Sequence, residues 1–163
     1  KEINGKDYYF VNKESFNQLI KNNSFFEHAE IFNNCYGTLK KPVLESLSKG
    51  KDVLFDIDWQ GTQQLKKIKN LKLVTFFILP PNIQVLKDRL INRHKGHEKM
   101  ILQRMDKFNE EISHWKEYNY VFVNDDLDEC CNKIQNVILA EKKGQSYSQN
   151  LNEIEERIKK LII

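Results

Sequence analysis

Two carboxylates stand at the end of a short apolar run, in the sequence VLFDID over residues 53–58. Side chains alternate along a strand, so Asp56 and Asp58 are predicted to point to the same side at its carboxyl end. Two carboxylates placed together are unfavourable unless they meet a metal ion, a base edge or a cation. Gly61 follows and would let another group approach the backbone closely. The pair therefore fits either a ligand site or an ordinary solvated strand end.

Three of the four arginines fall within sixteen residues, in a chain that has 22 lysines. Arg89 and Arg93 are four positions apart, on one face of a predicted helix, and Arg104 lies one element later. Guanidinium groups bind phosphate oxygens in bidentate pairs, so three converging arginines would suit a phosphate in transfer. The alternative is a solvated helix face, with ion pairs to Asp88 or Glu98.

The histidines provide less evidence for a functional site than the acids and arginines do. The polar segment HKGHEK over residues 94–99 resembles a mobile lid between two helices. His94 and His97 fit a surface loop better than a metal site, because no third ligand accompanies them. His28 and His114 have no nucleophile nearby in the sequence, so neither is assigned a catalytic role.

Composition excludes several classes of protein. The chain has 163 residues, 40% of them hydrophobic and 30% charged, which fits one globular domain. A net charge of +3 is too small to predict a nucleic-acid partner. No apolar run approaches the roughly 18 residues of a membrane span. Three cysteines, two of them adjacent, form no disulfide or zinc pattern, which favours the cytoplasm.

Hydrophobic spacing predicts alternating strands and helices. Strands are expected at 7–11, 53–58, 73–79 and 121–123, with a hairpin over 25–36 that turns at Asn33 and Asn34. Helices are expected after Asn12, between Pro42 and Gly50, at 63–68, from 83 to the break at 94–97, from there to 117, at 127–141 and along 151–161. Short apolar strands alternating with helices indicate an α/β fold with a parallel sheet covered on both faces. Its ligand should lie beyond the carboxyl ends of the strands.

Six features in order carry a family resemblance. They are EINGKDYYFV, FFEHAEIFNNCYGT, VLFDIDWQG, FFILPP, the arginine spacing and VNDD. Together they are similar to guanylate kinases, especially bacterial ones. The resemblance implies a nucleoside-monophosphate-kinase-like fold, in which a parallel sheet is flanked by helices. It also implies a small mixed GMP-binding subdomain over 1–40, a core over 41–92 and 112–163, and a lid over 93–111.

The resemblance implies an ATP:GMP phosphotransferase of purine nucleotide metabolism, which forms GDP and ADP. Tyr8 and Tyr36 match tyrosines whose hydroxyls meet the phosphate of GMP. Glu27 matches the acid that reads guanine, and Thr38 and Asp58 match further contacts to the base.

The remaining correspondences concern the phosphates and ATP. The arginines that would neutralise the transferring phosphate are Arg89, Arg93 and Arg104. Asp56 matches an acid near the phosphates and the Mg²⁺ that accompanies ATP, while no residue is expected to bind the metal directly. Asn124 falls where the family lines the adenine pocket, and Glu2 matches another acid near the GMP subsite.

The chain departs from the family in one respect. A Gly-rich phosphate loop of the type GxxxxGK[ST] is absent, and Gly50-Lys51 lacks both the partner glycine and the hydroxyl residue. We therefore expect that the ATP-gripping N-terminal segment and its strand are missing, and that the chain alone is a poor kinase.

Two alternatives to a guanylate kinase stay open. One is a guanylate-kinase-like module of scaffold proteins, which binds phosphorylated peptides in the same pocket without catalysis. The guanine-reading and lid residues are all in place, which favours the enzyme. The other is a kinase for another nucleoside monophosphate, which Glu27 and the motif CYGT disfavour. A monomer and a homodimer are equally compatible with the sequence.

Overall fold

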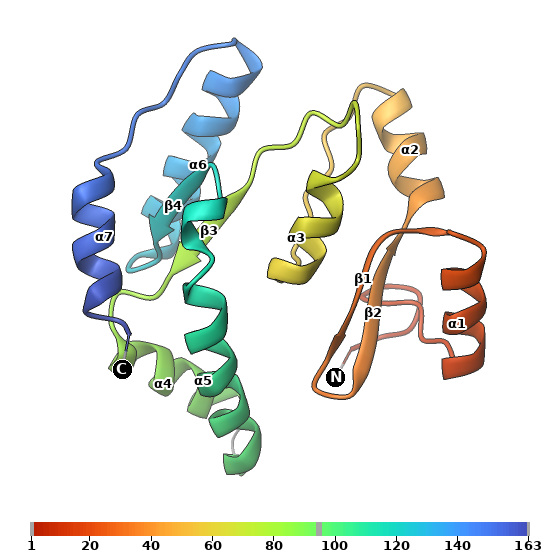
Figure 1. The fold of residues 1–163 in the computed structure, drawn as a ribbon, viewed down its shortest axis with the longest axis horizontal. Coiled ribbons are helices and arrows are strands. Elements are labelled where there is room, and N and C mark those ends of the chain that lie inside the picture. Colours follow the sequence, from red (N-terminus) through yellow and green to blue (C-terminus); the bar gives the residue numbers. More distant parts are fainter. Residues whose placement is uncertain (1, 94–95, 163) are drawn as a thin grey trace. The chain divides into compact units, whose positions relative to one another are not determined.

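The computed structural model describes residues 2–93 and 96–162. They divide into two compact units, Lys1–Leu73 and Val74–Ile163 (Figure 1). Each unit has a hydrophobic core of its own. The expected division into a GMP-binding subdomain, a core and a lid stays a prediction.

The first unit is built on an antiparallel hairpin. Its elements, in chain order, are α1 (Lys13–Lys21), β1 (Phe25–Ile31), β2 (Asn34–Leu39), α2 (Lys40–Ser48) and α3 (Trp59–Lys66). Asn12 caps α1 as predicted, because its side chain accepts a hydrogen bond from the backbone N–H of Ser15 at 2.8 Å. Gly50, with a φ of +71°, follows the end of α2, where a helix stop was predicted.

The hairpin turns at Phe32 and Asn33, whose φ angles of 50° and 65° are both left-handed. Two successive left-handed residues make the tight turn that matches the twist of the strands. The predicted turn is therefore confirmed to within one residue. A bulge interrupts the pairing near the start of β1, between the pairs Phe25–Leu39 and Glu27–Thr38.

The predicted strand over 53–58 is wrong as a paired strand. The segment runs extended, and Val53, Phe55 and Ile57 pack on the core around Phe26 and Leu65. Alternation therefore holds, and Leu54, pointing the other way, is 85% exposed. A strand is defined by its hydrogen-bonded neighbour, and among the described residues this segment has no paired neighbour.

Three other predicted elements also differ. Residues 7–11 do not form a strand: the chain turns over residues 5–7, where Gly5 has a φ of +78°, and an isolated bridge joins Asn4 and Tyr8. The helix predicted to reach residue 117 ends earlier, at Ile112, and a short 3-10 turn at Trp115–Glu117 follows. The helix predicted at 63–68 begins earlier, at Trp59, because Asp58 caps it.

The second unit surrounds a parallel pair of strands. Its elements are β3 (Phe76–Leu79), α4 (Ile83–Arg93), α5 (Glu98–Ile112), the turn at Trp115–Glu117, β4 (Tyr120–Val123), α6 (Leu127–Lys142) and α7 (Leu151–Lys159). Phe76 pairs with Tyr120 and Leu79 with Val123. The strand β3 ends immediately before Pro80 and Pro81, as predicted.

Both faces of this parallel pair are covered, as the α/β prediction required. On one face, Val121 packs with Ile112 of α5 and Ile158 of α7. On the other, Tyr120 and Phe122 pack with side chains of α6, among them the fully buried Val137. Neighbouring strand residues thus enter different clusters, as the alternation of side chains demands.

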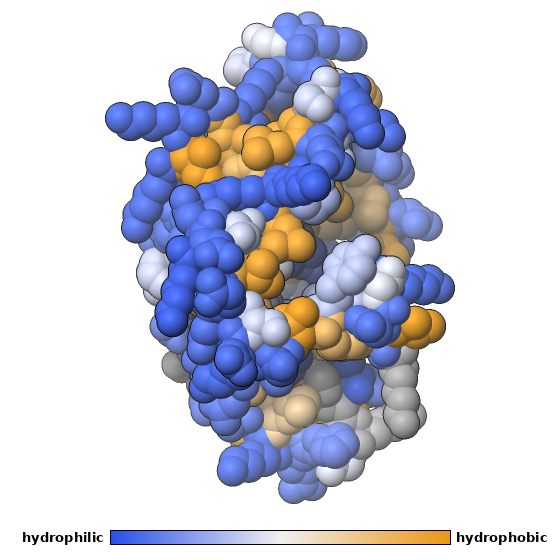
Figure 2. Space-filling view, turned by 90° about the vertical axis from the view of Figure 1, so that its right-hand side faces the viewer, coloured by the Kyte–Doolittle hydropathy of each residue, from blue (hydrophilic) through white to orange (hydrophobic). Residues whose placement is uncertain are grey.

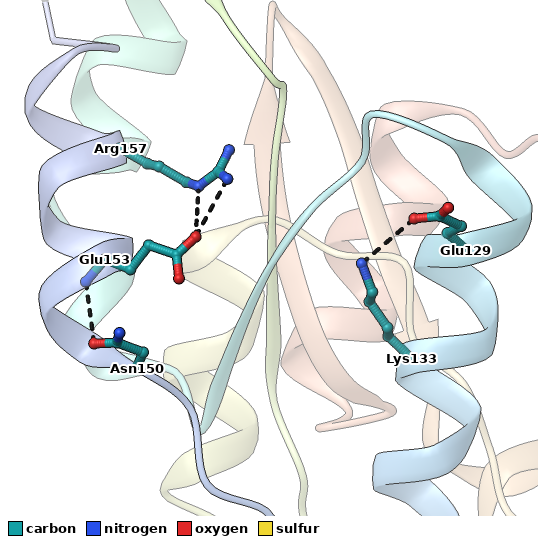
Figure 3. A network of polar contacts seen from close by, with 5 residues as sticks. All are labelled: Glu129, Lys133, Asn150, Glu153 and Arg157. Carbon is teal, nitrogen blue, oxygen red and sulfur yellow. Dashed lines mark hydrogen bonds and ion pairs between the residues drawn. The ribbon is translucent and has the colours of Figure 1, made fainter.

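Surface pairs reinforce the two C-terminal helices (Figure 3). In α7, the side chain of Asn150 accepts from the backbone N–H of Glu153 at 3.3 Å, and Arg157 meets the carboxylate of Glu153 at 3.3 Å. In α6, Lys133 lies 3.6 Å from Glu129. Exposed pairs of this spacing stabilise a helix by about 0.3–0.5 kcal/mol each, so the buried clusters supply most of the stability.

The surface carries both apolar and hydrophilic side chains. Figure 2 shows apolar side chains reaching one face in several separate places, set among hydrophilic ones. Scattered apolar side chains are ordinary on folded proteins. Among the described helices, none combines the length and apolar character needed to cross a bilayer.

We expect Leu79→Ala to lower the free energy of unfolding by about 3 kcal/mol. Leu79 is 1% exposed at the centre of the cluster between β3, α5 and α7, so truncation leaves a cavity. Urea unfolding measures the change. The control Leu102→Ala removes a side chain that is 65% exposed and should change stability by less than about 0.5 kcal/mol. Equal losses in the two variants would contradict the assigned core.

Candidate functional site

A buried carboxylate lies on the hairpin of the first unit. Glu27, in β1, is only 5% exposed, and the hydroxyl of Thr38 in β2 donates to its Oε1 at 2.5 Å. The bulge beside Phe25 shifts the register so that Glu27 stands opposite Thr38. Bulges commonly redirect a side chain in this way. The local geometry of the hairpin therefore places the carboxylate of Glu27 in a buried position, where it can accept hydrogen bonds.

The first turn of α3 closes the other side of this carboxylate. A Cβ atom placed on Gly61 would lie 2.8 Å from Oε2 of Glu27, closer than real Cβ atoms approach a neighbour. A side chain at this position would displace the end of Glu27, so glycine leaves the carboxylate its room. Asp58 caps the same helix by accepting from the backbone N–H of Gly61 at 3.0 Å. Asp58, Gly61 and Glu27 thus form one cluster with Thr38.

The electrostatics of the cluster follow from burial. Desolvation raises the pKa of Glu27, and the negative charge of Asp58 raises it further. The hydrogen bond from Thr38 and the nearby His28 lower it in part. The site therefore concentrates acceptor oxygens in a poorly hydrated place. Such a site suits a ligand edge that presents two adjacent N–H donors.

Two tyrosines stand close to each other in this unit. The rings of Tyr8 and Tyr36 meet edge to face, with centroids 5.8 Å apart. They are 45% and 38% exposed, so both can meet a ligand from solvent. Tyr36 and Thr38 are two residues apart in β2 and share a face of the strand. The structure thus brings together four predicted GMP-binding residues on one hairpin and its flanking segment.

The predicted pair of acids at the end of 53–58 has two environments. Asp56 is exposed, whereas Asp58 is half-buried and bound to the first turn of α3. Among the described residues, no group of three or more His, Cys, Asp or Glu side chains gathers as a possible metal site.

The predicted phosphate-binding arginines all belong to the second unit. Arg89, in α4, donates from Nη1 to the carbonyl oxygen of Asn124 at 2.9 Å and from Nη2 to that of Asp125 at 3.5 Å. Arg89 and Asn124 therefore meet at the carboxyl end of β4. Arg93 is exposed in the last turn of α4, and Arg104 is half-buried in α5, which packs against α4.

The lid prediction falls partly outside the described residues, because His94 and Lys95 are not among them. Glu2 is exposed.

Sequence reasoning assigned no role to Gln64, which contacts the strand that carries Glu27. Its side-chain amide donates to the carbonyl oxygen of His28 at 2.7 Å and accepts from the N–H of His28 at 3.1 Å. The two residues are 36 positions apart, so only the packing of α3 on β1 reveals the contact. The one available signal was that Gln64 lies within the predicted helix over 63–68, three positions after Gly61.

Comparisons with known proteins agree with one another. The family model described as guanylate kinase matches residues 1–141. A guanylate kinase of Novosphingobium aromaticivorans is 48% identical over 150 residues, which cover 92% of this chain and 68% of the relative. A guanylate kinase of Paramagnetospirillum magneticum is 45% identical over 141 residues, which cover 86% of this chain and 66% of the relative.

A solved structure extends the comparison to the fold. The crystal structure of guanylate kinase from Anaplasma phagocytophilum matches with a TM-score of 0.71 and 36% sequence identity. The match covers 86% of this chain and 68% of that one. The chain thus spans about two thirds of the length of the proteins it matches.

We expect Glu27→Gln to stabilise the fold more at pH 7 than at pH 4, relative to the unchanged chain. The pKa of Glu27 is raised in the folded state, so the contribution of this group to stability is present below the ordinary carboxyl value of 4.5 and is lost as the pH rises through the raised pKa. Glutamine does not ionise and escapes that loss. Urea unfolding at both pH values measures the effect.

The control for this comparison is Glu30→Gln, which removes an exposed carboxylate from the same strand. If the two variants show the same change between pH 4 and pH 7, the burial of Glu27 does not set the effect.

Proposed function

Because this chain belongs to the guanylate kinase family, we propose that it binds GMP through its first unit and serves an ATP:GMP phosphotransferase that forms GDP and ADP. The observation that carries the proposal is the buried acceptor cluster of Glu27, Thr38 and Asp58. Phosphoryl transfer also needs a cradle for the phosphates of ATP. GMP binding is therefore the part of the proposal that the residues of this chain test directly.

The cluster suits guanine for a chemical reason. Guanine presents a ring N–H and an exocyclic amine side by side, and a carboxylate can accept from both. Adenine has an acceptor at the corresponding ring nitrogen and no amine at C2, since its amine is at C6, where guanine carries a carbonyl. A buried site whose polar groups pair only with the right base rejects the wrong one, since the wrong base leaves those groups unpaired. Glu27 would accept from guanine, with Asp58 and Thr38 completing the contacts.

The phosphate of GMP would meet the hydroxyls of Tyr8 and Tyr36. During transfer, Arg89, Arg93 and Arg104 would neutralise the charge of the moving phosphate. This role requires the arginines to approach the nucleotide as the lid closes, which also excludes water. Asp56 is assigned to the phosphates, and Asn124 to the adenine of ATP.

Mg²⁺ is proposed to arrive with ATP and to supply neutralisation of its phosphates. The exposed carboxylate of Asp56 could contact a hydrated ion, whereas the described residues gather no three-ligand site. The residues present therefore fit a metal carried by the nucleotide. The roles of the protein residues are to bind, orient and shield the two nucleotides.

The setting proposed for this activity is the cytoplasm, with free nucleotides as ligands and no nucleic-acid partner. The small net charge of +3 and the three free cysteines support it. A monomer or a homodimer would serve equally, because the proposed GMP contacts all belong to one chain.

We expect the 163-residue chain to bind GMP and not AMP in titration calorimetry with Mg²⁺ present. Glu27→Ala should weaken GMP binding by about ten- to a hundredfold, because it removes hydrogen bonds to a charged acceptor, worth about 1.5–3 kcal/mol. The matched control is Glu30→Ala, on the same strand but exposed, which should leave the affinity unchanged. A folded chain that binds AMP as tightly as GMP would refute guanine reading.

A further inference from the structure

We propose that Gln64 is the positioning residue for guanine recognition: it fixes the strand that carries Glu27 and thereby sets the preference for a base with a 2-amino group. The inference rests on the proposed function, because it concerns how the same pocket selects its base. It adds a residue that does not touch the nucleotide.

The contact is a two-point clamp. The carboxamide of Gln64 pairs with both backbone polar groups of His28, at 2.7 Å and 3.1 Å. An N–H can only donate and a carbonyl can only accept, so this pairing also fixes which way the amide points. His28 directly follows Glu27 in β1. The clamp therefore holds the backbone one residue from the carboxylate that reads the base.

The helix α3 presents three functional positions to this strand, at a spacing of three residues. Asp58 caps the helix and acts electrostatically on Glu27, Gly61 lies beneath the Glu27 carboxylate, and Gln64 holds His28. Residues three apart lie along one side of a helix. Asp58 and Gly61 lie at the start of the contact between α3 and β1, next to the carboxylate of Glu27. Gln64 fixes the other end of this contact.

Phe26 of β1 packs with Leu65 of α3, but the packing leaves a hollow beside the clamp. A hollow of about 230 Å³ lies beside the clamp, and its lining includes Ile20 of α1, Phe25, Phe26, His28 and Gln64. We expect the part of β1 around His28 to shift into this room when its hydrogen bonds to α3 are lost. A small shift is enough to matter, because recognition of the base depends on where the carboxylate of Glu27 lies.

The second unit provides an internal control. The side chain of Gln149 makes the same two-point clamp on Val121 of β4, accepting from its N–H at 2.9 Å and donating to its carbonyl oxygen at 2.8 Å. Removing either clamp takes away two hydrogen bonds to a strand. Only the clamp of Gln64 adjoins the acceptor cluster.

The test compares Gln64→Met with Gln149→Met, since methionine keeps the side-chain length without the amide. Calorimetry gives the dissociation constants for GMP and for IMP, which lacks the 2-amino group. We expect Gln64→Met to weaken GMP binding about tenfold or more and to reduce the preference for GMP over IMP. We expect Gln149→Met to lower the melting temperature while keeping that preference. Equal effects on the preference, or no effect of Gln64→Met, would overturn the proposal.

Two further measurements keep the test decisive. If Gln64→Met does not fold, Gln64→Glu retains the acceptor for His28 N–H, but it loses the donor and places a negative charge against the carbonyl oxygen of His28. An unchanged preference in that variant overturns the proposal. Carbon-13 NMR titration of the Glu27 carboxyl group needs no ligand. Its pKa should move down towards the ordinary value in Gln64→Met as the carboxylate gains water, and an unmoved pKa counts against positioning. If the unchanged chain binds neither nucleotide, the proposed function fails while this titration still decides the role of Gln64.

Discussion

The burial of one carboxylate constrains the whole first unit. Glu27 is taken out of water on a two-stranded hairpin, where an acid would ordinarily face solvent. Three separate features make this possible: the bulge that turns it inward, the hydroxyl of Thr38 that satisfies one oxygen, and the absence of a side chain at Gly61. Each of these features accommodates the carboxylate of Glu27. The arrangement of hairpin and helix is thus explained by the carboxylate that they enclose.

The burial of Glu27 favours recognition of a base but lowers the stability of the fold. A desolvated carboxylate next to Asp58 favours its neutral form, yet recognition of two N–H donors requires the ionised form. The fold therefore carries an unfavourable group at neutral pH, which a nucleotide base would relieve by pairing with it. Strained or unfavourable groups of this kind tend to occur at ligand sites. The rest of the unit, with the core around Phe26 and Leu65, supplies the compensating apolar burial.

Local signals predicted much of this structure, and contacts between distant residues explain the rest. Asn12, Gly50 and the Pro80–Pro81 pair act within a few residues of themselves, so the element ends that they mark were confirmed. The extended segment over 53–58 has the right alternation, but pairing depends on a neighbour that no local pattern supplies. In the site, the grouping of Glu27 with Thr38 follows from the hairpin. The contact of Gln64 with His28 spans 36 residues, and sequence patterns at that distance carry no register information.

In both units, a glutamine side chain pairs with the backbone of a strand residue, but the consequences differ. An edge strand leaves N–H and carbonyl groups without a strand neighbour, and a glutamine side chain can pair with one of each at a single residue. Gln149 does this for β4, where the strand residues on either side are buried core. Gln64 does it for β1, where the preceding residue is an acceptor that must stay in place. Identical hydrogen bonds therefore stabilise a core in one unit and orient a recognition group in the other, and the identity of the adjacent residue decides which.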